Sequence, residues 1–218
     1  IKNYLQKFNI DVTLDPHPDG TRFNLIALIG DKEKDSILLS AHTDVVPARQ
    51  EDWDSHPFKL LKKNGRLYGR GALDMKGFMA LMLAFAPTFK KNEKILQTSI
   101  TYALTFDEEE GTFGAAQIVD FLAKLKLKPK LAIVGEPTGM RPFNGHKGGL
   151  EIITKIKGSS GHASDPTGKV NAIYFAARVI SFIEQISKKL ARSPAKNCKF
   201  RPPYTTLSVG QIQGGEAR

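Results

Sequence analysis

The chain has 218 residues, enough for one large domain, or for a medium and a small domain, with a substantial core. Its 41% hydrophobic and 25% charged residues are typical of a soluble globular protein and exclude fibrous and low-complexity classes. The one cysteine, Cys198, excludes an intrachain disulfide framework and a multi-thiolate zinc site, so any metal is expected to be held by nitrogen and oxygen. This cysteine usage favours a reducing, cytoplasmic location.

The net charge of +10 raises the question of nucleic-acid binding. The lysines, however, fall in short scattered groups and accompany no recognised nucleic-acid motif, so a solvated surface is the preferred interpretation. The longest apolar stretch, residues 78–87, is about half of the ~20 residues that cross a bilayer, and nothing near Ile1 resembles a secretory signal. We therefore expect neither a nucleic-acid partner nor a membrane role.

Apolar runs rich in Ile, Leu and Val predict buried strands, and helix-like stretches lie between them. The alternation is typical of an α/β layered architecture with a largely parallel sheet, whose sites gather at the carboxyl ends of the strands. The expected strands are residues 24–29, 36–40, 99–106 and 131–135, and the expected helices of this region are residues 77–89 and 113–125.

The character of the sequence changes around residues 145–149, where glycines precede a new strand, loop and helix pattern. We predict a first domain at residues 1–146 and a smaller α+β domain at residues 147–218. The expected elements of the smaller domain are strands at residues 150–157 and 204–213 and a helix at residues 171–190.

Four segments carry a ligand-type side chain from an apolar or glycine-rich run into a turn: residues 42–44 (HTD), 74–77 (DMKG), 107–111 (DEEEG) and 135–138 (GEPT). Each alone has an ordinary structural explanation, such as a strand-end histidine, a helix N-cap, an acidic loop or a turn cap. Together they place one imidazole and several carboxylates at one edge of the sheet. That is an N/O ligand set suited to zinc, cobalt or manganese.

Local spacing adds detail to two of these segments, and His162 is a further candidate outside them. His42 and Asp44 are two residues apart, so an extended backbone points both the same way, and the carboxylate can orient a metal-bound imidazole. The carboxylates of residues 107–110 repel one another, whereas divalent cations offset that repulsion and leave one carboxylate free as a base. His162 lies in a glycine- and serine-rich loop, where an imidazole could donate to a developing oxyanion or be a plain loop residue.

These segments resemble, in order and spacing, the di-zinc aminoacylase/deacetylase/carboxypeptidase family of metalloexopeptidases. The resemblance implies a zinc-exopeptidase-like α/β/α catalytic domain and a smaller ferredoxin-like α+β domain for lid and dimerisation, both incomplete in this chain. It is carried by residues 40–47 (SAHTDVVP), 69–77 (GRGALDMKG), 107–109 (DEE) and 135–138 (GEPT). Residues 145–148 (GHKG), 161–166 (GHASDP) and 170–173 (VNAI) are most similar to the members that deacetylate N2-acetyl-L-ornithine.

The resemblance implies two divalent metal ions, with zinc as the first choice and cobalt or manganese as alternatives. His42 and Glu136 would bind the first ion, Asp74 would bridge both, and Glu109 would bind the second. The family also implies a non-proline cis peptide bond between Asp74 and Met75. Its last metal ligand, a C-terminal histidine, has no counterpart in these residues, so we expect an N-terminal fragment with one complete and one incomplete ligand set.

For catalysis, the resemblance implies that Glu108 is the general base and that Asp44 orients His42. His162 would reach into the active site of a partner subunit, which implies a homodimer formed through the smaller domain. The expected reaction is the hydrolysis of a small N-acyl amino acid, N2-acetyl-L-ornithine, to acetate and L-ornithine in arginine biosynthesis, by a metal-activated water that Glu108 deprotonates.

Two alternatives remain from the sequence. A sister amidohydrolase, such as succinyl-diaminopimelate desuccinylase, a dipeptidase or an aminoacylase, would share every metal ligand. A non-catalytic metal-binding scaffold is the alternative outside enzymes. The presence of Glu108 beside Glu109 counts against the scaffold, because a pure binding site has no need of a spare base.

Overall fold

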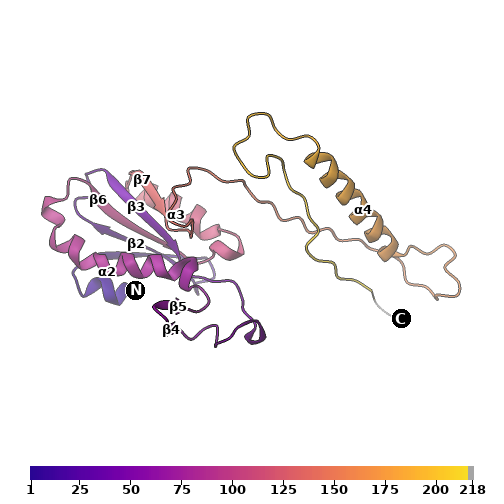
Figure 1. Cartoon of the computed structure of the whole chain (residues 1–218), viewed down its shortest axis with the longest axis horizontal. Helices are drawn as coiled ribbons and strands as arrows, with labels where there is room; N and C mark the ends of the chain where they lie inside the picture. Colours follow the sequence, from indigo (N-terminus) through magenta and orange to yellow (C-terminus); the bar gives the residue numbers. More distant parts are fainter. Residues whose placement is uncertain (216–218) are drawn as a thin grey trace. The chain divides into compact units, whose positions relative to one another are not determined.

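The computed structural model describes residues 1–215. The chain divides into two compact units, Ile1–Arg141 and Pro142–Arg218. The first unit contains the sheet with helices α2 and α3, and the second contains helix α4 (Figure 1). The division follows Arg141, whereas the sequence-based domain boundary follows His146, and that boundary stays a prediction.

A five-stranded sheet in the order β1-β2-β6-β3-β7 forms the centre of the first unit. β3 pairs in parallel with both β6 and β7, whereas β1 pairs antiparallel with β2, and β2 antiparallel with β6. The strands are β1 (Asp11–Pro16), β2 (Phe23–Ile29), β3 (Ser36–His42), β6 (Ser99–Thr105) and β7 (Pro129–Val134).

The sheet is therefore mixed, and the prediction of a largely parallel sheet is wrong for β1 and β2. The connection between these two strands, residues 17–22, is too short for the crossover of a dozen or more residues that a parallel return requires. The three strands whose carboxyl ends carry the predicted ligands, β3, β6 and β7, do run parallel.

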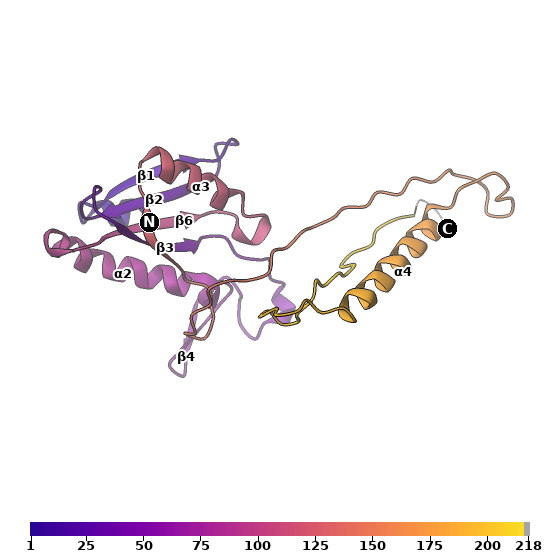
Figure 2. The ribbon, with the colours of Figure 1, turned by 90° about the horizontal axis from the view of Figure 1, so that it is seen from above.

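Helices α2 (Gly77–Lys91) and α3 (Phe113–Lys124) cover opposite faces of the sheet (Figure 2). Successive side chains of a strand point to opposite faces, so Ala27 of β2 packs in the same core as Met82 of α2, while Ile26 packs with Ile118 of α3. This layering confirms the α/β fold class.

Several shorter elements escaped the sequence analysis because each has too few residues to show a periodic pattern. They are α1 (Lys2–Gln6), the hairpin of β4 (Leu61–Lys63) and β5 (Arg66–Tyr68), the 3-10 turns η1 (Gln50–Asp52), η3 (Glu93–Ile95) and η4 (Glu108–Glu110), and the π-helical turn η2 (Ala72–Lys76).

One segment of the described chain, Ala72–Lys91, is long and apolar enough to cross a membrane by length and composition alone. This is weak evidence, because the core helix of a soluble protein passes the same test. Met79, Met82 and Ala86 of this segment are buried in the core beneath the sheet. We therefore interpret α2 as a core helix of the first unit.

The second unit contains helix α4 (Ala172–Ala191), which agrees with the predicted helix. Asn171 caps this helix, because its Oδ1 accepts the N–H groups of Ile173 and Tyr174 at 2.9 and 3.2 Å. No strand is formed in the described part of this unit, so the predicted strands at residues 150–157 and 204–213 are wrong here. A strand needs a neighbouring backbone to pair with, which an apolar pattern alone does not supply.

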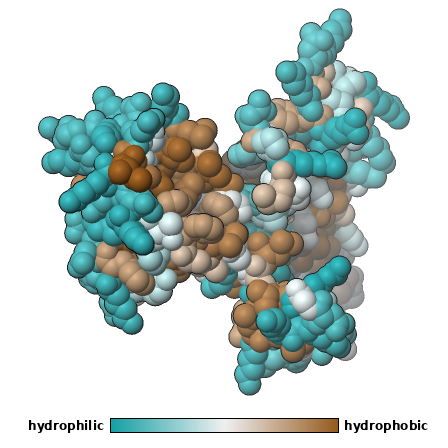
Figure 3. Space-filling view, turned by 60° about the vertical axis from the view of Figure 1, so that its left-hand side comes forward, coloured by the Kyte–Doolittle hydropathy of each residue, from teal (hydrophilic) through white to brown (hydrophobic). Residues whose placement is uncertain are grey.

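Large apolar side chains are also exposed in both units, and the space-filling view shows apolar areas among hydrophilic ones (Figure 3). Leu81 and Phe85 of α2 are exposed, as are Ile173 and Phe182 of α4. Helix α4 has no buried residue, so its apolar side is available to contact another surface.

Candidate metal centre

The ligand-type side chains of the first unit lie at the carboxyl ends of three parallel strands. His42 is the last residue of β3, Glu108 and Glu109 follow β6, and Glu136 follows β7. Because these strands are parallel neighbours, their carboxyl ends meet at the same edge of the sheet. Asp74 reaches this edge from η2, just before α2.

His42, Asp74 and Glu136 form one cluster of possible metal ligands. The His42 Nε2 atom lies 3.1 Å from Asp74 Oδ1 and 3.9 Å from Glu136 Oε1. One ligand atom from each residue lies within 4.8 Å of the other two. The His42 side chain is 1% exposed, so the surrounding protein holds its ring in place, and its Nε2 atom faces the carboxylates. Three such atoms can surround a single cation.

His42, Glu108 and Glu109 form a second, overlapping cluster whose ligand atoms also lie within 4.8 Å of one another. The family resemblance instead implies that Glu109 and Asp74 bind a second metal together. That pairing stays a prediction, as does the separation of Glu108 from the ligand set.

Asp44 contacts both sides of this centre. Its backbone carbonyl lies 3.0 Å from His42 Nδ1, and its carboxylate Oδ1 lies 3.4 Å from the same nitrogen. The carboxylate also accepts the backbone N–H of Glu108 at 3.2 Å and that of Glu109 at 2.9 Å. Acceptors at Nδ1 favour a proton there and leave Nε2 free to bind a cation. The contacts to the acidic turn were not visible in the sequence.

The turn that carries Asp74 has an unusual backbone. The Asp74–Met75 peptide bond is cis, which confirms the prediction from the family resemblance. Gly71, which precedes the turn, has a φ of 77°, and a Cβ atom there would clash with Val45 Cγ1. Met75 is completely buried in the core, so the turn is anchored on both sides of Asp74.

Burial and mutual repulsion raise the pKa of two carboxyl groups in the centre. Burial is the main cause for Glu108, with a further contribution from the charge of Glu109 and an opposing one from His42. Burial also raises the pKa of Glu136, and the nearby carboxylate of Asp74 adds to the effect. Without a cation, the centre therefore holds crowded negative charge.

The pKa of His42 is also raised. Burial by itself lowers it, but the hydrogen bond to Asp74 and the contacts with Asp44 outweigh that effect. An imidazole surrounded by carboxylate oxygens is a donor set that suits zinc, cobalt or manganese, and a divalent cation would offset the repulsion among the carboxylates. The residues present thus fit a divalent metal ion.

Two further residues named from the sequence, His162 and Asp107, have local contacts of their own. His162 belongs to the second unit, where it is exposed and its Nδ1 lies 2.7 Å from Ser164 Oγ. Asp107, the first residue of the acidic run 107–110, is 2% exposed and accepts the N–H of Gly114. Nothing in the local sequence distinguishes Asp107 from the glutamates that follow it.

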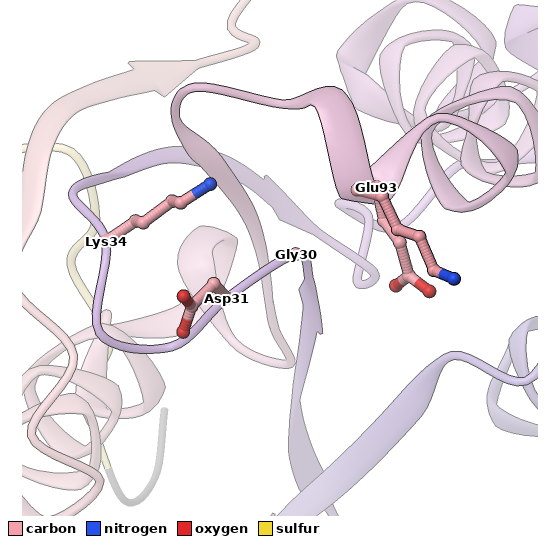
Figure 4. A pocket seen from close by; sticks show the side chains of 5 residues that line it. Gly30, Asp31, Lys34 and Glu93 are labelled. Carbon is pink, nitrogen blue, oxygen red and sulfur yellow. The ribbon is translucent and has the colours of Figure 1, made fainter.

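Two recesses of about 320 Å³ each lie elsewhere in the first unit, and neither includes a residue of the metal-ligand clusters. The first lies near Gly30, which follows β2, and charged side chains of separate segments line it (Figure 4). The lining residues are Gly30, Asp31, Lys34, Glu93 and Lys94 in the first recess, and Asp52, Trp53, Asp54, Ser55 and Tyr68 in the second.

Two curated relatives of this chain are both named acetylornithine deacetylase. An acetylornithine deacetylase from Proteus mirabilis (strain HI4320) is 35% identical over 218 residues, which are 100% of this chain and 54% of that protein. An acetylornithine deacetylase from Pasteurella multocida (strain Pm70) is 36% identical over 196 residues, covering 90% of this chain and 50% of that protein. The chain thus spans about half the length of these curated relatives.

Solved structures share the fold. An M20 family metallo-carboxypeptidase from Sulfolobus solfataricus matches with a TM-score of 0.50 and 25% identity, over 62% of this chain and 30% of that one. A tripeptidase from Staphylococcus aureus matches with a TM-score of 0.59 and 20% identity, over 99% of this chain and 54% of that one.

The profile of "Peptidase family M20/M25/M40" matches residues 38–202, a range that includes both metal-ligand clusters. The match covers well over half of the chain. The chain therefore belongs to peptidase family M20/M25/M40, a metal-dependent family of hydrolases.

Proposed function

We propose that the intact protein is an amide hydrolase that removes the acetyl group from N2-acetyl-L-ornithine, a step of arginine biosynthesis in the cytoplasm. The observation that carries the proposal is the convergence of His42, Asp74 and Glu136 beside the acidic turn that holds Glu108. The relatives named acetylornithine deacetylase support the choice of substrate.

Two divalent ions, zinc in preference to cobalt or manganese, are the proposed cofactors. His42, Asp74 and Glu136 would hold one ion, and Asp74 and Glu109 would contribute to the other. When bound, the ions polarise the acyl carbonyl and lower the pKa of water. Asp44 supports this arrangement because its oxygens face His42 Nδ1. They favour a proton on Nδ1 and so leave Nε2 as the metal-binding nitrogen.

Glu108 is the proposed general base. Its raised pKa favours uptake of a proton from the attacking water, and its backbone N–H is held by Asp44. The water oxygen forms a bond to the acetyl carbon, and the bond from that carbon to nitrogen breaks. Glu108 then passes the proton to the departing amine, so that acetate and L-ornithine are released.

We also propose a homodimer formed through the smaller unit, in which His162 of each chain donates to the oxyanion at the partner's site. Phe175 and Phe182 of α4 are exposed and seven residues apart, so they lie on one face of the helix and support a contact surface in this unit. Sedimentation of the intact protein tests the dimer, and a monomer at all concentrations would contradict it.

A substrate panel tests the proposed reaction. We expect zinc-loaded intact protein to give its highest kcat/KM with N2-acetyl-L-ornithine, compared with succinyl-diaminopimelate, other acylated amino acids, dipeptides and tripeptides. A preference for the succinylated substrate or for peptides would replace the proposal with the sister activity. Absence of any hydrolysis despite bound zinc would favour a non-catalytic scaffold.

A further inference from the structure

The acidic turn that supplies Glu108 and Glu109 begins with a residue that faces the protein interior. Asp107 is 2% exposed, and its Oδ1 accepts the backbone N–H of Gly114 at 2.8 Å. Its backbone carbonyl accepts the N–H of Thr112 at 2.9 Å. Asp107 therefore closes the turn twice, once through its side chain and once through its backbone.

A buried asparagine, Asn24, binds the backbone carbonyl of the same glycine, Gly114. Asn24 of β2 is completely buried, and its Nδ2 donates to the carbonyl of Gly114 at 3.0 Å and to Asp15 Oδ2 at 3.3 Å. Among the described residues its Oδ1 has no hydrogen-bond partner. Buried side chains thus bind both the N–H and the carbonyl of Gly114, in the first turn of α3.

Gly114 leaves no room for a side chain at this point. A Cβ atom there would lie 2.7 Å from Asp107 Oδ1 and 2.8 Å from Asn24 Oδ1. Helix α3 is itself fixed to the sheet through Ile118 and Leu122. The bond from Asp107 to Gly114 therefore connects the acidic turn to a rigid element rather than to a loop.

A carboxylate bonded to a free N–H in the first turn of a helix is a strong, charge-assisted contact, and burial makes its loss costly. On the opposite side of the turn, the Asp44 carboxylate accepts the N–H groups of Glu108 and Glu109. The two glutamates are thus held between Asp44 at the metal centre and Asp107 at the core.

We propose that Asp107 is a positioning residue that directs Glu108 and Glu109 into the metal centre by tying their turn to Gly114. Asp107 acts through its neighbours, since its own carboxylate is bonded to the helix. The inference rests on the proposed function for the roles of the two glutamates, but metal binding alone can test the tie.

The test compares variants of the intact protein by zinc affinity, measured in competition with a chromophoric chelator, and by kcat and KM for N2-acetyl-L-ornithine. We expect Asp107→Ala to weaken zinc binding and to lower kcat by about 10- to 100-fold, with KM changed much less. Asp107→Asn is expected to stay close to the wild type, because its amide oxygen can still accept the N–H of Gly114. Glu110→Gln, a change at an exposed residue of the same turn, is the matched control.

Gly114→Ala provides a second, charge-neutral variant. Alanine is the better helix former, so helix propensity alone predicts a more stable protein. The added methyl group would instead displace the Asp107 carboxylate, and we expect the zinc affinity and kcat to fall as in Asp107→Ala. If Asp107→Ala does not fold, Gly114→Ala and Asp107→Asn decide the question.

Two outcomes would overturn the inference. Unchanged zinc affinity and kcat in a less stable Asp107→Ala protein would make Asp107 a structural residue only. An equal loss of zinc affinity and kcat in Asp107→Asn and Asp107→Ala would assign the effect to the charge of Asp107 rather than to its hydrogen bond with Gly114. If the wild type hydrolyses none of the substrates but zinc affinity still falls in Asp107→Ala, the proposed function fails and the positioning role stands.

Discussion

Glu108 and Glu109 are adjacent residues of one turn, yet their proposed roles differ. Glu108→Gln keeps the size of the side chain but removes the proton acceptor, so we expect kcat to fall by at least about 10²-fold. Zinc content should stay close to that of the wild type, because Glu108 is not a proposed ligand. Steady-state kinetics and atomic absorption measure the two quantities. Substantial activity in Glu108→Gln would remove Glu108 from the role of base.

Glu136 predicts a pH dependence of the metal-free protein. Burial and the charge of Asp74 raise its pKa above the ordinary value of 4.5, so the folded chain favours the protonated form. The corresponding stabilisation is fully present below pH 4.5 and is lost as the pH rises through the raised pKa. Denaturant unfolding across this pH range should show that the free energy of unfolding falls less in Glu136→Gln than in the wild type as the pH rises. Glu110→Gln, a change at an exposed residue, is the control. Parallel curves for Glu136→Gln and the wild type would contradict this expectation.

At the scale of elements, the turn before α2 has a specific requirement for glycine. Gly71 and the hairpin residue Gly65 have similar positive φ values, 77° and 73°, but only Gly71 faces a neighbour, Val45, that a Cβ atom would meet. We expect Gly65→Ala to lower the free energy of unfolding by about 1–2 kcal/mol, the general effect of this backbone region. Gly71→Ala should lower it further and also weaken zinc binding, because the displaced turn carries Asp74.

Denaturant unfolding and chelator competition measure these two effects, and Gly65→Ala serves as the control for the backbone conformation. Equal losses of stability with unchanged zinc affinity in both variants would show that contact with Val45 does not position Asp74.

At the scale of the whole molecule, a bound cation should stabilise the folded state. Zinc at 100 times its Kd is expected to raise the free energy of unfolding of the intact protein by about 2.7 kcal/mol. His42→Ala should largely abolish this increase, because His42 belongs to both ligand clusters. Denaturant unfolding with and without zinc measures this increase. His56→Ala is the control, because His56 lies outside both clusters. An equal zinc effect in His42→Ala would indicate binding elsewhere.

The elements that the sequence predicted correctly are those with long apolar patterns. The runs that became β2, β3, β6 and β7 are recognisable because each is rich in apolar residues, although β7 is mostly exposed in the structure and not buried as predicted. Strand β1 was missed because its two apolar side chains, Val12 and Leu14, alternate with polar residues and form no continuous apolar run. The mixed pairing was missed as well, because strand direction follows from the connections and not from the composition of a strand.

The sequence by itself determined the kinds of side chain at the site and their positions at strand ends, because strand patterns and turn residues act over a few neighbouring positions. Only the tertiary structure decided how these side chains are held. Asp44 bonds to the N–H groups of residues 64 and 65 positions away, and Asp107 turns inward to Gly114 while Glu108 joins the ligand cluster. Such contacts depend on strand register and on the packing of α3 against the sheet, and no local pattern encodes either.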